Sequence, residues 1–145
     1  MPNLTSYSAA YIADARAKID LQLATYHAFL IAAQTGEDTA AMGAARDAFE
    51  PVFLRNLVLA MDHYFDAIPP EAESRDGDPI NEVRALSDCI MHNHHKFQSD
   101  GHIALSPSTT VLGLKNGDDI RLTVPDFKRL ADAFFAEISE RYPEA

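Results

Sequence analysis

The feature that most constrains the fold is a helical period of apolar residues from Thr5 to about Gln34. Apolar side chains recur there at three- and four-residue steps, at Ile12, Ala15, Ile19, Leu23, Tyr26 and Leu30. Because an α-helix turns once every ~3.6 residues, this spacing places all of them on one face. A helix of ~30 residues would be ~45 Å long. We therefore expect a long helical scaffold that ends near Gly36 and buries one face against other helices.

A second helix is predicted from Ala40 to about Ala67, capped by Glu37-Asp38-Thr39 and stopped by Pro69-Pro70. Pro51 lies inside it, and because proline lacks an N–H and clashes with the preceding turn, we expect a kink near residues 47–50. Beyond the kink, the residues expected to be buried are Val52, Phe53, Leu57, Ala60, Tyr64 and Ile68.

Two further helices are predicted in the C-terminal half. Asp78 is expected to cap the third helix and Pro79 to be its first residue. The third helix includes the stretch from Asn81 to Asp100, with Val83, Leu86, Ile90 and Phe97 on its core face. Thr123 and Asp126 resemble a capping box for the closing helix. The residues of that helix expected to face inward are Phe127, Leu130, Phe134 and Ile138.

Asn116-Gly117 is a strong signal for a hairpin turn, because a type I′ turn needs positive φ at both central residues. Two short arms, Val111 to Lys115 and Asp118 to Leu122, flank it, and we expect them to lean on the helices. The sequence thus predicts an all-α fold, an antiparallel bundle of about four helices with one small β-hairpin around Asn116-Gly117.

Composition limits the class of protein. A length of 145 residues suits one domain, residues 1–145, with a real core. The net charge of -10 repels phosphate backbones, and the 12 Lys and Arg form no basic run, so unguided binding to nucleic acid is not expected. No apolar run approaches the ~20 residues that span a bilayer, and residues 1–5 lack a secretion signal's pattern, so we expect no membrane partner.

The single cysteine, Cys89, allows no intramolecular disulfide, which fits a reducing, cytoplasmic location. Cys89 follows Asp88, whose negative charge opposes thiolate formation, and lies near the predicted core face. We therefore expect an inert, buried thiol.

The polar side of the third helix carries most of the candidate chemistry. Arg84, Asp88 and His92 span about 80° of arc on a helix, and His95 would continue this ridge one turn later. Asp88 could pair with both Arg84 and His92. A guanidinium, a carboxylate and an imidazole in this order suit work on a phosphate, as clamp, orienting group and proton carrier. The alternative, which the spacing alone favours, is a solvated helix face with i,i+4 pairs.

The residues E-V-R-A-L-S-D-C-I-M-H-N, followed by L-G-L-K-N-G-D-D-I-R-L-T and a closing D-F helix, resemble HEPN-like proteins. HEPN denotes the nucleotide-binding helical domain shared by higher eukaryotes and prokaryotes, and the resemblance extends from Glu82 to Ile138. It implies a helical bundle that forms a homodimer. In catalytic members an Arg, a polar residue and a His cut RNA without a metal across the dimer cleft. Many members are toxins or phage-defence effectors.

On this resemblance the family's histidine corresponds to His92 and the asparagine that often follows it to Asn93, whereas the usual Arg-Asn pair corresponds to Ser87 and Asp88. Arg84 matches an upstream arginine of some relatives, but seven residues separate it from His92, more than the family's spacing. The candidate catalytic residues are therefore Arg84, Asp88, His92 and Asn93.

Three hypotheses about function follow. The first is a catalytically degenerate, dimeric interaction module of a bacterial defence or toxin–antitoxin system, with a possible protein partner. The second is a metal-independent endoribonuclease that uses Arg84 and His92 on RNA. The third is a metal-binding bundle in which Asp62 and His63 of the second helix join His92 and His95. Neither of the first two requires a cofactor.

Overall fold

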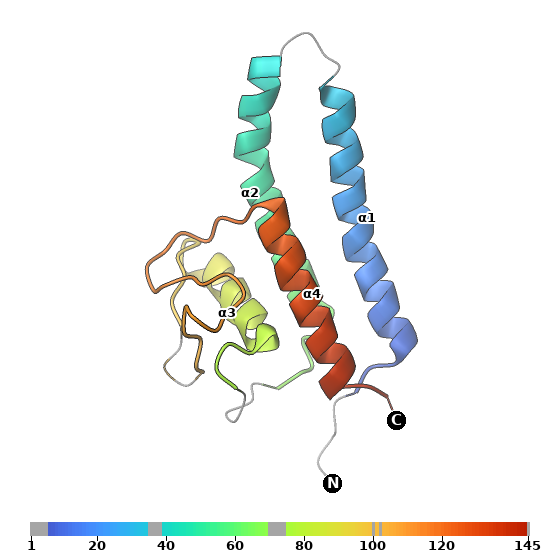
Figure 1. Ribbon diagram of the computed structural model, residues 1–145, viewed down its shortest axis with the longest axis vertical. Helices are drawn as coiled ribbons and strands as arrows, with labels where there is room; N and C mark the ends of the chain where they lie inside the picture. Colours follow the sequence, from blue (N-terminus) through green and yellow to red (C-terminus); the bar gives the residue numbers. More distant parts are fainter. Residues whose placement is uncertain (1–5, 35–38, 70–74, 100, 102, 145) are drawn as a thin grey trace.

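The computed structural model describes residues 6–34, 39–69, 75–99, 101 and 103–144. These residues form four helices, α1 (Ala9–Ala33), α2 (Thr39–His63), α3 (Pro79–His92) and α4 (Val124–Arg141). Figure 1 shows α1 and α2 as a long hairpin, with α4 lying along its lower half and α3 on the side of α2 and α4 away from α1. The all-α bundle predicted from the sequence is confirmed.

The α1 helix confirms the first apolar period. Its N-cap is Ser8, whose hydroxyl accepts a hydrogen bond from the backbone N–H of Tyr11 at 3.0 Å, so the helix begins later than Thr5. The predicted face is buried at Ile12, Ala15, Ile19, Leu23 and Tyr26. Leu30 is half-buried, because it lies in the distal part of the hairpin. Gly36, the predicted C′ residue, lies outside the described residues.

The α2 helix continues through Pro51 as one element and ends at His63, earlier than predicted. The chain beyond it turns more tightly, as shown by the N–H of Phe65 donating to the carbonyl of Asp62 and the N–H of Ile68 to that of Phe65. Val52 was expected to be buried and is 47% exposed. It lies about 200° around the helix from the buried Leu54, so the two side chains cannot share a face.

The α3 helix begins as predicted, with Asp78 as its cap and Pro79 as its first residue. It ends at His92, so the prediction that it continues toward Asp100 is wrong. His94 and His95 have φ angles of 53° and 64°. A right-handed helix cannot continue through left-handed residues, and the loop beyond it brings Phe97 into the core.

The predicted β-hairpin is not formed by residues 111–122. The N–H of Phe97 donates to the carbonyl of Asp118 at 2.8 Å, and the N–H of Ile120 to that of His95 at 2.7 Å. The chain around residue 119 therefore pairs with the loop after α3 rather than with residues 111–115. Gly117 has a φ of 94°, but no positive φ is found at Asn116, so the turn is not of type I′. The side chain of Asn116 instead accepts a hydrogen bond from the N–H of Ser99.

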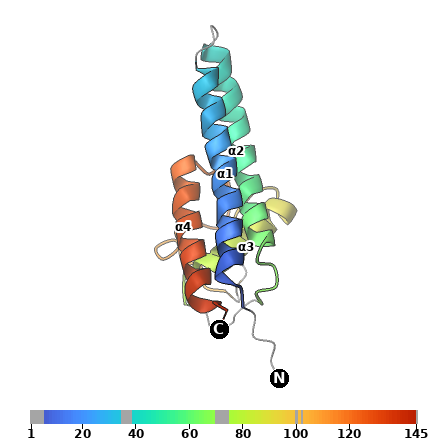
Figure 2. The ribbon, with the colours of Figure 1, turned by 90° about the vertical axis from the view of Figure 1, so that its right-hand side faces the viewer.

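The core lies in the lower half of the molecule, where α3 and α4 pack on the α1–α2 hairpin. Its largest fully buried side chains include Phe65, Phe127, Phe134, Met61 and Leu86. The distal half of the hairpin extends beyond α3 and α4 in both views (Figures 1 and 2). Among the described residues, no helix has the length and apolar character needed to cross a membrane.

Candidate functional site

Arg84, the first of the candidate catalytic residues, faces α2 rather than the rest of its own ridge. Its guanidinium donates hydrogen bonds to the carbonyls of Ile68 and, at 3.4 Å, of Phe65, both in the chain just beyond α2. Its Nε lies 3.8 Å from a carboxylate oxygen of Asp62, and its side chain is 18% exposed. The carbonyl of Ile68 lies just past the helix end and gains a donor from Arg84, whereas the carbonyl of Phe65 also accepts from the N–H of Ile68. Arg84 thus ties α3 to the end of α2.

Asp62 and Ser87 complete this contact between α2 and α3. Burial raises the pKa of Asp62, whereas the Arg84 guanidinium and a hydrogen bond from the Ser87 hydroxyl act to lower it. Ser87, which the sequence resemblance aligns with the arginine of catalytic HEPN proteins, is 7% exposed. This position therefore faces a neighbouring helix, where it contributes to packing between α2 and α3.

The other candidate residues lie at the exposed end of α3. His92 is the last residue of the helix and is exposed, as is Asp88 one turn before it. The Asn93 side chain donates to the carbonyl of Lys96 at 2.7 Å and so closes the turn that follows the helix. Among the described residues, the structure shows no contact between Arg84 and either Asp88 or His92. Their catalytic roles stay a prediction, because a site shared between two protomers would need the second chain.

The structure does not bring together the four residues of the metal hypothesis. His95 lies beyond the end of α3, where its backbone carbonyl binds the loop at Ile120, so it does not continue the helical ridge. The Nδ1 of His63 lies 3.6 Å from a carboxylate oxygen of Asp66, and the carboxylate of Asp62 contacts the guanidinium of Arg84. In the part of the chain that the structure describes, no three His, Cys, Asp or Glu side chains gather closely enough to hold a metal ion.

Cys89 is buried, as expected. Its Sγ lies 3.3 Å from the backbone N of Gln98 and 3.4 Å from the carbonyl oxygen of the same residue. The thiol therefore holds the loop after α3 against the helix, a structural role.

Sequence reasoning missed a buried carboxylate in the first turn of α3. Glu82 is 2% exposed, and its two oxygens accept hydrogen bonds from the backbone N–H groups of Val111 and Leu112, at 2.8 and 3.0 Å. Burial raises the pKa of Glu82, and these two donors offset part of that effect. Glu82 anchors the long loop before α4. Because its partners are about 30 residues away, no local pattern in the sequence marks this role.

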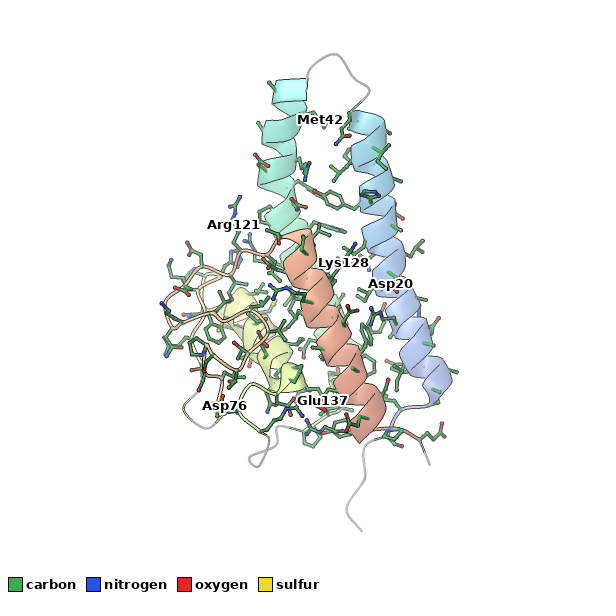
Figure 3. All side chains as sticks on the ribbon, viewed as in Figure 1. Asp20, Met42, Asp76, Arg121, Lys128 and Glu137 are labelled. Atoms are coloured by element: carbon green, nitrogen blue, oxygen red, sulfur yellow. The ribbon has the colours of Figure 1, made fainter. Side chains whose placement is uncertain are left out.

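An exposed apolar groove lies on the α1–α2 hairpin, away from the candidate catalytic residues. This groove of ≈ 730 Å³, which we call the hairpin groove, is lined by residues of these two helices: Leu21, Gln22, Thr25, Tyr26, Phe29, Leu30, Met42, Ala45, Arg46, Phe49 and Phe53. Met42 lies near the distal end of the hairpin, whereas Asp76 and Glu137 lie at the opposite end of the molecule (Figure 3). The sequence analysis missed this groove because it assigned one apolar face to each helix.

Comparison of the chain with protein-family models, with curated proteins and with solved structures finds no match.

Proposed function

We propose that this chain is a catalytically degenerate, HEPN-like helical interaction module that acts in a bacterial defence or toxin–antitoxin setting. The observation that carries the non-catalytic part is the position of Arg84. Its guanidinium is already bound to the carbonyls of Ile68 and Phe65 and to Asp62. To clamp a phosphate, Arg84 would have to give up these bonds. That would leave the Ile68 carbonyl without this donor and Asp62 without its counter-charge in a half-buried contact, which costs free energy.

The surroundings of His92 support the same proposal. A general base is usually oriented by a second group that hydrogen-bonds to its imidazole. In the described part of the chain, no hydrogen bond orients the side chain of His92, and Asp88 makes no contact with it. The family's arginine position is held by the buried Ser87, which cannot bind an anion as a cation would. The HEPN-like identity itself is carried by the sequence resemblance from Glu82 to Ile138.

The test is an RNA-cleavage assay on the purified full-length chain with a chelator present. We expect structured and single-stranded RNA to stay intact even when the concentration of the protein is well above that of the RNA. His92→Ala should be indistinguishable from the unmodified chain. The proposal fails if the unmodified chain cuts RNA without metal and His92→Ala does not, because that result would establish the ribonuclease that uses Arg84 and His92.

A further inference from the structure

The hairpin groove is the part of the molecule that the fold leaves without a partner. Leu21, Phe29 and Phe49 line it and are 66%, 59% and 51% exposed. A second groove of ≈ 600 Å³, on the side where α4 begins, is lined by α4 residues such as Lys128. The hairpin groove has no α4 residue in its lining, so α1 and α2 alone form it.

The floor of the hairpin groove is an aromatic cluster. The rings of Tyr26 and Phe53 are 4.9 Å apart, and Phe49 stacks on Phe53 at 5.7 Å. Ring packing of this kind fixes the positions of the side chains before any partner arrives, which lowers the entropy lost on binding. Aromatic residues are also enriched at the centres of protein interfaces.

The hairpin groove is lined almost entirely by uncharged residues, although the chain as a whole has many charged ones. Charged residues make up 23% of the whole sequence, whereas among the described residues that line the groove only Arg46 is charged. Depletion of charge at the centre is typical of homodimer interfaces. A single cation offers no pattern that would select a strongly charged partner, and the chain's net charge of -10 opposes binding to an anionic membrane or to nucleic acid.

The exposed area is in the range that an interface needs. Because a large apolar side chain presents ~150–250 Å² of surface, Leu21, Phe29 and Phe49 together expose on the order of 300 Å². That equals a whole apolar patch on a typical monomer, which measures a few hundred Å². A standard interface takes ~800 Å² from each partner, so this apolar patch would form its centre and the exposed Gln22, Thr25 and Arg46 part of its polar rim.

We propose that a second copy of this chain occupies the hairpin groove, so that two α1–α2 hairpins form a four-helix bundle around a twofold axis. A twofold interface needs only one self-complementary face, which each copy carries. Facing helix pairs bury such faces in the bundles of many proteins. The bodies formed by α3 and α4 do not obstruct the contact, because the distal half of the hairpin extends beyond them (Figures 1 and 2). This inference rests on the proposed function, since it names the partner of the interaction module, and it places the dimer contact on α1 and α2 rather than on α3.

The experiment measures the mass of the full-length chain by light scattering and its dissociation constant by sedimentation equilibrium. The unmodified chain is expected at twice its 16.0 kDa. Phe29→Glu and Phe49→Glu should each weaken dimerisation at least ~30-fold, as expected for central aromatic anchors. Both side chains are more than half exposed in one copy, so these variants should keep the monomer fold, which circular dichroism checks.

Two matched controls locate the interface. The first control is Ile31→Glu. Ile31 lies two residues from Phe29 on the same helix, is 54% exposed and does not line the groove. Met91 lies on α3 beside His92 and is 60% exposed. The substitution Met91→Glu would disrupt a dimer in which the two α3 helices face each other. We expect both to dimerise as tightly as the unmodified chain. Added salt should tighten the dimer, because it screens repulsion between two acidic copies.

Three outcomes would overturn the proposal. One is a monomer at all concentrations up to about 100 µM, which corresponds to a binding free energy weaker than about -5.5 kcal/mol. That result would leave the groove to a different partner. Another is a dimer that Met91→Glu breaks while Phe29→Glu and Phe49→Glu do not. The last is binding of the unmodified monomer to lipid vesicles that is lost in Phe29→Glu. None of these outcomes touches the RNA-cleavage result, so failure of this inference and failure of the proposed function can be told apart.

Discussion

Gly77 shows how one residue fixes the start of α3. It has a φ of 81°, and a Cβ added there would lie 2.4 Å from the backbone oxygen of Thr109. Its own N–H donates to the carbonyl of Ala104 at 3.0 Å, so the loop before α3 and the loop before α4 touch backbone to backbone. Only glycine permits both the positive φ and this close approach.

Gly77→Ala should therefore lower the free energy of unfolding by about 2–4 kcal/mol, because it adds left-handed strain and a backbone clash. The control is Gly43→Ala in α2, where an added Cβ meets nothing within 4 Å. That change should stabilise the chain by up to about 1 kcal/mol, since alanine is the better helix former. Urea denaturation followed by circular dichroism measures both. Equal effects from the two substitutions would show that the contact with Thr109 is not needed.

Glu82 predicts a specific dependence of stability on pH. Burial raises its pKa above the ordinary 4.5, so the folded chain holds a proton at pH values where the unfolded chain has lost it. This contribution to stability is complete below the ordinary pKa and is lost as the pH rises through the raised pKa. Glu82→Gln removes it. The unfolding free energy of the original chain minus that of Glu82→Gln should fall as the pH rises above the ordinary pKa of 4.5. A difference that grows with pH would contradict this assignment.

At the scale of elements, the caps predicted for α3 and α4 are confirmed, whereas the predicted hairpin is not formed. Thr123 and Asp126 form a reciprocal capping box at the start of α4, and Asp78 caps α3. Such motifs are predictable because their partners lie two or three residues apart in sequence. The Asn116-Gly117 turn failed as a hairpin because its flanking residues found better partners, among them the carbonyl of His95, in the loop after α3. A local turn signal cannot anticipate that competition.

Thr123→Ala should destabilise the chain by about 1 kcal/mol, because the backbone N–H of Asp126 loses its acceptor at the start of α4. Thermal unfolding measures the loss. Thr25→Ala provides the comparison, since its hydroxyl donates to the carbonyl of Leu21 within α1 and caps nothing. If both substitutions had the same effect, the cap would not contribute to α4 beyond an ordinary exposed threonine.

At the scale of the whole molecule, ion pairs and polar contacts join elements that are distant in sequence. Asp78 at the start of α3 pairs with Arg141 at the end of α4, and the buried Glu137 pairs with Arg75. Arg84 belongs to this group, because it joins α3 to the chain beyond α2. These contacts hold the lower half of the bundle together. The distal half of the α1–α2 hairpin extends beyond α3 and α4 (Figures 1 and 2).

Arg84→Ala should therefore cost about 2–4 kcal/mol of unfolding free energy, since it removes the donor to the Ile68 carbonyl and the counter-charge of the half-buried Asp62. Asp88→Ala, one turn further along the same helix and exposed, should change stability by less than about 0.5 kcal/mol. Urea denaturation of the two variants checks this contrast. A small effect of Arg84→Ala would mean that the guanidinium is available for other work, and it would weaken the case against catalysis.

The sequence by itself determined the four helices, the caps of α3 and α4 and most of the buried faces, because helical periodicity and capping depend on neighbours within one or two turns. It also marked Cys89 as buried. The tertiary structure decided where α3 ends, what Arg84 binds and what residues 117–120 pair with. These outcomes depend on contacts between residues that are far apart in the chain. The same is true of the hairpin groove, because it exists only once α1 and α2 lie side by side and α4 leaves their distal half uncovered.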